Sequence, residues 1–212
     1  MLTLDHLVVI APSLDAGAAH VRDRLGMEMA AGGRHPQMGT HNLVLRLGDA
    51  VFLEVIAVDP AAPPPGRPRW FGLDDAAAVR AHWEAGRRLR AWVARTSDLD
   101  AVLAREGDLL GEKVRVSRGD RAWDFALRPD GCLPGDGAVP PVIDWGGRGN
   151  PAAEMADRGA RLRALEMEHP DPERVAALHA RLGIGDPPRL RQGARLRFRA
   201  LIETPGGVRA LD

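Results

Sequence analysis

The stretch Leu4–Gly26, "LDHLVVIAPSLDAGAAHVRDRLG", decides the fold because its pattern returns twice further along the chain. A β-branched apolar run predicts a strand over Leu2–Ile10. An Ala-rich segment then predicts a helix that begins after Ser13, a good N-cap, and stops at Gly26. A strand and a helix in this order begin a β-α-β-β-β unit.

The remainder of that unit carries three further strand signals. "AGGRHPQMG" is expected to be a loop because of its Gly and Pro content, and "GDA" between the last two apolar runs is a hairpin signal. The expected strands are a short one at Met27–Ala30 and two longer ones at His41–Leu47 and Val51–Val58.

The same layout restarts at Leu89, where "LRAWVARTSDLDAVLAREG" aligns Leu99-Asp100 with Leu14-Asp15. Strands are expected in this second copy around 113–117, 122–127 and 139–145. A partial third copy begins with "RLRALEMEHPDPERVAALHARLGIG" and continues with the strand of "RLRFRALIETPGG". The segment before it, "GGRGNPAAEMADRGA", is expected to be an irregular connector. The predicted organisation is a first module at 1–60, a Pro-rich linker with a helix at 61–87, a second module at 88–147 and a partial third module at 148–212, all in one compact unit.

Composition narrows the class of protein. The chain has 212 residues with 29 Lys+Arg and 29 Asp+Glu, and this balance argues against a nucleic-acid partner. The single cysteine, Cys132, excludes an intrachain disulfide. The N-terminus shows no signal-peptide pattern and no run long enough to span a membrane, so a cytoplasmic location without membrane contact is expected. Phosphate loops, nucleophile elbows and HExxH motifs do not occur.

With these repeats the chain resembles the glyoxalase-like branch of the vicinal-oxygen-chelate superfamily, which also includes bleomycin-resistance proteins and ring-opening dioxygenases. The resemblance is carried by the first copy and its "GGRHPQMGTHN" loop, by "DLDAVLAR" and "PPVIDW", and by "HPDPERVAALHARLG". It implies an α+β fold in which tandem βαβββ modules form a curved open cup of mainly antiparallel sheet with helices outside. It also implies a small-molecule ligand, lyase, isomerase or dioxygenase chemistry, and a homodimer as one form of assembly.

The resemblance places candidate metal ligands on the strands of the cup. His6 and Glu54 occupy the positions of the family's ligand pair, and imidazole and carboxylate suit a divalent ion such as Zn, Ni, Mn or Fe. The second module offers fewer metal ligands, because Ala91, which cannot coordinate an ion, aligns with His6. Asp144 aligns with Glu54 and is the candidate ligand of that module. Glu203 resembles the glutamate of a closing strand. A metal-bound site and a site with no metal therefore both stay open.

Further candidates surround that pair. Glu54 in an otherwise apolar strand is costly unless paired or bound, which favours a role in the site over a chance position. His41 and His35 are candidate catalytic groups, each with the plainer alternative of a strand-end or loop residue. Candidate substrate-binding residues are Arg34, Asn42, Trp92 and Trp145.

Two functions from different classes follow. The first is a glyoxalase-like enzyme in which His6 and Glu54 bind a metal or act as acid and base. The second is a non-catalytic binding protein, like the drug-sequestering members of the superfamily. Two features favour it: Ala91 stands where a metal ligand is expected, and aromatic residues are available to stack on a bound molecule.

Overall fold

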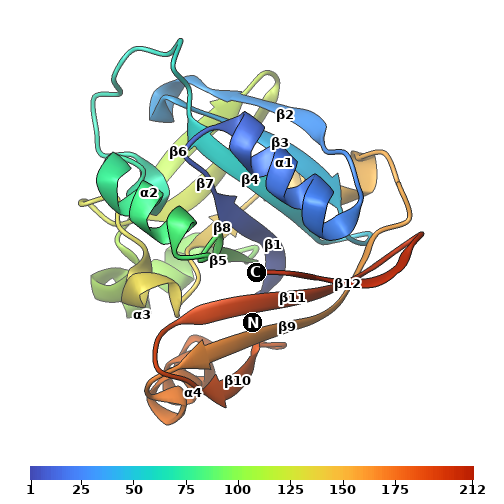
Figure 1. Cartoon of the computed structure of the whole chain (residues 1–212). Helices are drawn as coiled ribbons and strands as arrows, with labels where there is room; N and C mark the ends of the chain where they lie inside the picture. Colours follow the sequence, from blue (N-terminus) through green and yellow to red (C-terminus); the bar gives the residue numbers. More distant parts are fainter.

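The computed structural model describes all residues 1–212 and shows an α+β protein with two sheets (Figure 1). The larger sheet has eight strands in the order β2-β3-β4-β1-β5-β8-β7-β6. These strands are β1 (Thr3–Ile10), β2 (Ala30–His35), β3 (Thr40–Arg46), β4 (Phe52–Val58), β5 (Leu89–Arg95), β6 (Glu112–Arg118), β7 (Arg121–Leu127) and β8 (Val142–Asp144). The smaller sheet has four, in the order β10-β9-β11-β12: β9 (Arg161–His169), β10 (Arg189–Gln192), β11 (Arg197–Thr204) and β12 (Gly207–Leu211).

The first helix begins and ends where the sequence predicts. In α1 (Leu14–Leu25) the Ser13 side chain accepts a hydrogen bond from the amide of Ala16, and Gly26 ends the helix in the left-handed conformation with φ 68°. The other helices are α2 (Ala76–Glu84), α3 (Leu99–Leu110) and α4 (Pro172–Leu182), each preceded by an aspartate that caps it. None of the four helices combines the length and apolarity needed to span a bilayer.

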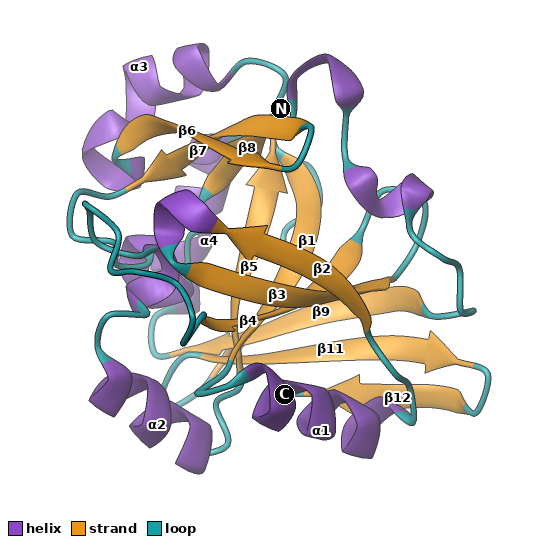
Figure 2. Cartoon of the chain, turned by 90° about the horizontal axis from the view of Figure 1, so that it is seen from above, coloured by secondary structure: helices purple, strands orange, loops and turns teal.

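The large sheet is two β-α-β-β-β modules joined side by side. Strand β1 pairs with β4 in parallel and β5 pairs with β8 in parallel, and the two modules meet through antiparallel pairing of β1 with β5. The sheet is curled, so that its outermost strands approach each other (Figure 2). The gap between them is bridged by a hydrogen bond of 2.7 Å from Gln37 Nε2 to Ser117 Oγ. The tandem-module cup is therefore observed.

Alternation along the strands divides the core into two clusters. Val8, Val93 and Phe125 belong to the cluster on the concave face of the large sheet. Leu7 and Trp92 belong to the cluster on the convex face, which also receives α1, α3 and α4. Helix α2 contacts both clusters, with Val79 in the concave one and Trp83 against the convex one, while the short 3₁₀ turn Trp70–Gly72 packs against the concave cluster.

The C-terminal unit does not complete the cup. Its four-stranded sheet lies against the convex face, where Met167, Phe198 and Ile202 join the same cluster as Leu7 and Trp92 (Figure 1). Strand β9, helix α4 and β10 do repeat the strand–helix order of the modules. The partial third copy thus covers the outside of the cup and contributes no strand to the concave face.

Two segments differ from the expectation. The Gly-rich stretch expected to be a loop is largely strand β2, because its backbone completes the edge of the sheet by pairing with β3. The expected irregular connector, residues 146–160, contains two 3₁₀ turns and packs at the cup. Arg46 Nη1 donates to the carbonyls of Ala153 and Met155, and Arg121 Nη1 donates to the carbonyl of Gly149.

Candidate active site

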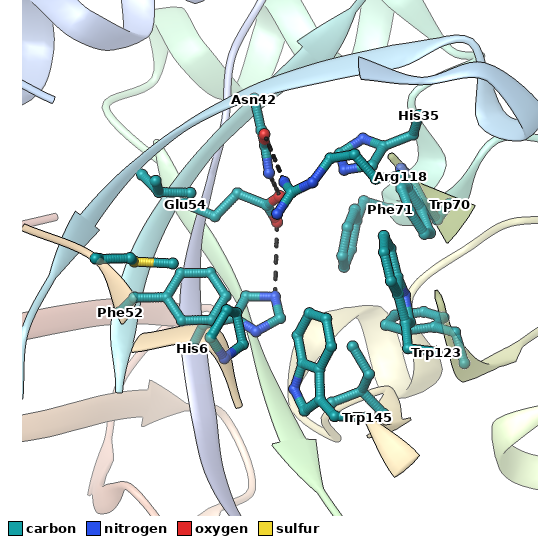
Figure 3. A pocket seen from close by; sticks show the side chains of 15 residues that line it. His6, His35, Asn42, Phe52, Glu54, Trp70, Phe71, Arg118, Trp123 and Trp145 are labelled. Atoms are coloured by element: carbon teal, nitrogen blue, oxygen red, sulfur yellow. Dashed lines mark hydrogen bonds and ion pairs between the residues drawn. The ribbon is translucent and has the colours of Figure 1, made fainter. Parts of the chain in front are cut away.

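The concave face holds a mainly apolar pocket, here called the cup pocket (Figure 3). It contains about 440 Å³ of space between atoms, part of it open to solvent, although the centre of a water molecule can occupy only about 30 Å³. The pocket is therefore narrow as it stands. Its lining residues come from both modules and the connector: His6, His35, Asn42, Val44, Phe52, Glu54, Trp70, Phe71, Arg118, Trp123, Phe125, Ile143, Trp145, Pro151 and Met155.

His6 is oriented by the aspartate that precedes it. The pairing of β1 with β5 shifts register between Leu4 and His6, and this irregularity lets the Asp5 carboxylate reach the same side as His6. Asp5 Oδ1 lies 2.6 Å from His6 Nδ1, while Asp5 Oδ2 accepts from Trp145 Nε1 at 2.9 Å and Asn150 Nδ2 at 2.7 Å. The ring also stacks on Phe52. These contacts leave Nε2 facing the pocket.

The charge of His6 follows from its two carboxylate neighbours. Burial alone lowers the pKa of the imidazole, but the hydrogen bond to Asp5 and the negative charges of Asp5 and Glu54 outweigh burial and raise this pKa to about 9. His6 is therefore an imidazolium at neutral pH. Its Nε2 lies 3.6 Å from Glu54 Oε2, which is close enough for charge attraction but long for a hydrogen bond.

Glu54 is buried on the neighbouring strand β4 and faces the same cavity. Burial raises the pKa of its carboxyl, but the positive charge of His6 and the hydrogen bond of Asn42 prevail, so the net shift of this pKa is downward. Asn42 Nδ2 donates to Glu54 Oε1 at 2.5 Å. Glu54 is thus ionised at neutral pH, with Oε2 directed toward His6 (Figure 3).

His35 and the aromatic side chains form the far wall. His35 Nδ1 lies 3.1 Å from Thr40 Oγ1, which also accepts from Trp70 Nε1 at 3.2 Å. Burial lowers the pKa of His35 to about 4, so this ring is neutral at pH 7. Phe71, which packs against Trp70 and Phe125, holds the left-handed backbone conformation with φ 60°, a strained arrangement for a bulky side chain. The wall is apolar apart from His35.

Arg118 reaches the cavity from β6 across the seam of the cup. Its Nη1 donates to Asn42 Oδ1 at 3.4 Å (Figure 3). Two glycines of β2 make room for this pair: a Cβ on Gly32 would lie 2.1 Å from Asn42 Oδ1, and one on Gly33 would lie 2.6 Å from Arg118 Cδ. The polar groups therefore form one chain, from Asp5 through His6, Glu54 and Asn42 to Arg118.

The structure brings together five of the residues expected at the site and leaves three binding or catalytic candidates outside the pocket. Those that line it are His6, His35, Asn42, Glu54 and Trp145. His41 alternates with Asn42 along β3 and does not line the pocket. Arg34 is exposed and pairs with Asp59 at 3.2 Å. Trp92 is fully buried in the cluster on the convex face, because the strand alternation turns Ala91 and Val93 inward instead.

The residues present do not fit a divalent ion held by protein side chains. Asp144 lies one position beyond Ile143, the residue of β8 that lines the pocket, and its Oδ1 accepts from the amide of Gly146. Glu203 belongs to the outer sheet and pairs with Arg163. No group of three or more His, Cys, Asp or Glu side chains is arranged to hold a metal. The donor set ends at His6 and Glu54, short of the three protein ligands of catalytic zinc sites.

Sequence reasoning missed several residues of the site. Asp5 had a signal, since it directly precedes His6, but regular alternation in a strand would have turned it away. No sequence signal pointed to Arg118, Trp70 or Phe71, because nothing local shows that their segments meet β2 and β3 across the cup. Asn150 lies in the connector that was expected to be irregular.

Comparisons with known proteins agree with this architecture. The model of the "Glyoxalase-like domain" family matches residues 4–183. No curated protein matches the chain. A solved structure of a hypothetical protein from Staphylococcus aureus is 13% identical, with a TM-score of 0.65 over 95% of this chain and 90% of that one. At this identity the likeness concerns the fold alone.

Methylmalonyl-CoA epimerases are also among the similar solved structures. A variant of the Streptomyces coelicolor enzyme is 20% identical over 68% of this chain and 95% of that one, with a TM-score of 0.41. The enzyme from Mycobacterium tuberculosis is 18% identical over 66% of this chain and 84% of that one, with a TM-score of 0.40.

Proposed function

Because the chain belongs to the glyoxalase-like domain family, we propose that it is a small-molecule enzyme that transfers a proton at a carbon next to a carbonyl group. The family match bears out the similarity to vicinal-oxygen-chelate proteins seen in the sequence. The observation that carries the proposal is the pair His6 Nε2 and Glu54 Oε2, two oppositely charged groups 3.6 Å apart that face one cavity.

Glu54 is the proposed base. One of its oxygens accepts from Asn42, which fixes the orientation of the carboxylate, and the other oxygen faces His6 and the cavity. A carboxylate in an apolar pocket is poorly hydrated, so it can accept a proton from carbon without first shedding water. In this mechanism Glu54 removes the proton and returns it to the same or a neighbouring carbon.

His6 is the proposed electrophile. Removal of the proton leaves negative charge on the carbonyl oxygen, and the Nε2–H of the imidazolium can donate to that oxygen from beside Glu54. Asp5 holds the other ring nitrogen at 2.6 Å and so keeps the ring in position. A preorganised cation in an aromatic, water-poor site stabilises such an oxyanion more strongly than one in bulk water.

The first test is proton exchange in D₂O on a panel of neutral ketones and 2-oxo acids with aromatic or branched substituents. The wild-type protein is expected to exchange α-protons faster than buffer, as followed by ¹H NMR. Glu54→Gln removes the base but keeps the shape, and a loss of roughly 10²-fold or more in exchange rate is expected, as is typical of general bases.

The matched control is Glu203→Gln, which removes a glutamate that lies on the outer sheet and does not line the pocket. This variant should exchange at the wild-type rate. Exchange no faster than buffer across the panel, or equal rates in wild type and Glu54→Gln, would eliminate the proposal.

A second candidate function is binding without turnover, and the aromatic lining favours it. Phe52, Phe71, Trp70, Trp123 and Trp145 offer ring faces and edges to a planar ligand. Calorimetry with planar and amphipathic compounds separates the two functions. Saturable binding in a protein that exchanges no protons supports this second function, and turnover of any bound compound removes it.

A further inference from the structure

A second cavity adjoins the cup pocket on its outer side. It has about 270 Å³ available to the centre of a water molecule, far more than the cup pocket. The two cavities share Val44, Arg118, Pro151 and Met155 in their walls. The outer one is rich in arginine, and we call it the arginine cavity. A molecule seated in both would pass Arg118.

Arg118 differs from the two other partly or fully buried arginines of this cavity. Arg46 pairs with Asp49 and binds backbone carbonyls of the connector, and Arg121 pairs with Glu154 and binds the carbonyl of Gly149. Arg118 has one long hydrogen bond, to Asn42 Oδ1 at 3.4 Å, and no carboxylate oxygen lies within ion-pair distance. Most of the five N–H donors of its guanidinium are therefore free.

The placement of this free guanidinium is built into the fold. Gly33 has φ 149°, and the absence of its side chain lets the Arg118 side chain lie across β2 instead of turning to solvent. Burial lowers the pKa of Arg118, so the cation is partly desolvated while still charged at neutral pH. A half-buried guanidinium with free donors in a cavity wall is suited to bind an anion through two parallel hydrogen bonds.

We propose that Arg118 binds a carboxylate group of the substrate, whose apolar or aromatic body fills the cup pocket beside His6 and Glu54. This inference rests on the proposed function, and it narrows the substrate class to small carboxylic acids. It assigns Arg118 the role of a specificity residue that orients the substrate toward the proton-transfer pair.

The charge balance of the site accommodates such an anion. The buried negative groups around the pocket are Asp5 and Glu54, and the positive groups are His6, Arg118 and Arg95, whose Nη1 lies 3.8 Å from Asp5 Oδ2. Arg121 is neutralised by its pair with Glu154. One positive charge is thus left over before a ligand binds. A substrate carboxylate would neutralise this excess, whereas a neutral ligand would leave it in a weakly polarisable environment.

The test compares carboxylates with their neutral amides. The probes are phenylacetate, 4-phenylbutanoate and 3-methylbutanoate, each against its primary amide, with binding followed by tryptophan fluorescence. Three of the five tryptophans line the cup pocket and the chain has no tyrosine, so the signal reports on this site. We expect at least one carboxylate to bind roughly tenfold more tightly than its amide, the size of one charged hydrogen-bonded contact.

Arg118→Gln should abolish this preference, and Arg118→Lys should keep only part of it because an ammonium lacks the planar fork. Arg115→Gln is the matched control: Arg115 lies on the same strand, is exposed and pairs with Asp124, so the preference should be unchanged. Equal affinity of wild type for acid and amide, survival of the preference in Arg118→Gln, or no binding of any of the six probes would each overturn the inference.

This outcome is separable from that of the proposed function. If only the assignment to Arg118 is wrong, exchange of neutral ketones still depends on Glu54. If the proton-transfer function is wrong, no ketone exchanges whatever the charge preference of the pocket.

Discussion

His6 lies between two carboxylates, and its protonation state decides how the site works. Asp5 contacts one ring nitrogen and Glu54 faces the other, so the imidazolium is favoured despite burial. His35, in the same pocket, has no carboxylate in contact and stays neutral. Two buried histidines in one cavity thus differ in charge because of their immediate neighbours.

The raised pKa of His6 predicts a loss of stability in alkaline solution. Between 6.5, the ordinary pKa, and about 9, the folded state holds a proton that the unfolded state has released. The free energy of unfolding should therefore fall as pH rises through this window, by up to about 1.4 kcal/mol per pH unit. The measurement is urea unfolding at a series of pH values.

His6→Gln should be less stable overall but should lack this alkaline slope. His41→Gln, on the other face of the sheet, is the control and should retain it. A wild-type slope that persists in His6→Gln would show that another group is responsible.

At the scale of residues, sequence reasoning proposed His6 and Glu54 as a pair from the family resemblance, and Glu54 also because a carboxylate in an apolar strand is costly. It also found Asn42 and Trp145. It misplaced Asp144 by one position, since a degenerate repeat aligns strands only to within a residue and a single step reverses the face. Arg118 was beyond its reach, because its role depends on the closure of the sheet across the cup.

At the scale of elements, β2 shows why a glycine-rich segment can be a strand. Gly32 and Gly33 lie at the edge where β6 approaches, and their missing side chains leave space that Asn42 and Arg118 fill. The sequence alone predicts a loop from the same glycines, because glycine marks both turns and positions where a neighbouring chain packs closely on a strand.

Gly32→Ala should therefore destabilise the protein by about 1–3 kcal/mol, as expected for overpacking. The new methyl group would meet the Asn42 amide and push it away from Glu54, so exchange activity should fall as well. Urea unfolding and the D₂O assay provide the measurements.

Gly66→Ala is the matched control, because nothing lies within 4 Å of a Cβ at that position. Its stability should stay within about 0.5 kcal/mol of wild type. Wild-type stability in Gly32→Ala would contradict the packing argument.

At the scale of the whole molecule, the sheet that stabilises the fold and the residues of the candidate site lie on different faces. The outer sheet packs on the convex face and the candidate site lies on the concave face of the same curved sheet. The sequence predicted the partial third copy but not that it packs on the convex face, because the pattern of apolar residues in its strands does not say which surface of the large sheet they cover.

Ile202→Ala tests this separation. Ile202 is fully buried in β11, and truncation should cost about 2–5 kcal/mol. Ligand affinity of the protein that remains folded should be unchanged, since the pocket is on the other face. Val208→Ala, at a position that is 62% exposed, should unfold like wild type. An altered affinity in Ile202→Ala would show that the two faces are coupled.

The connector over the cup pocket is held by two kinds of contact. Arg46 and Arg121 donate to its main-chain carbonyls, and its side chains Asn150 and Glu154 bind Asp5 and Arg121. The side chains of Pro151 and Met155 line the pocket and make none of these hydrogen bonds or ion pairs. New ligand preferences can therefore be engineered at these two positions while the hydrogen bonds and ion pairs that hold the connector stay in place.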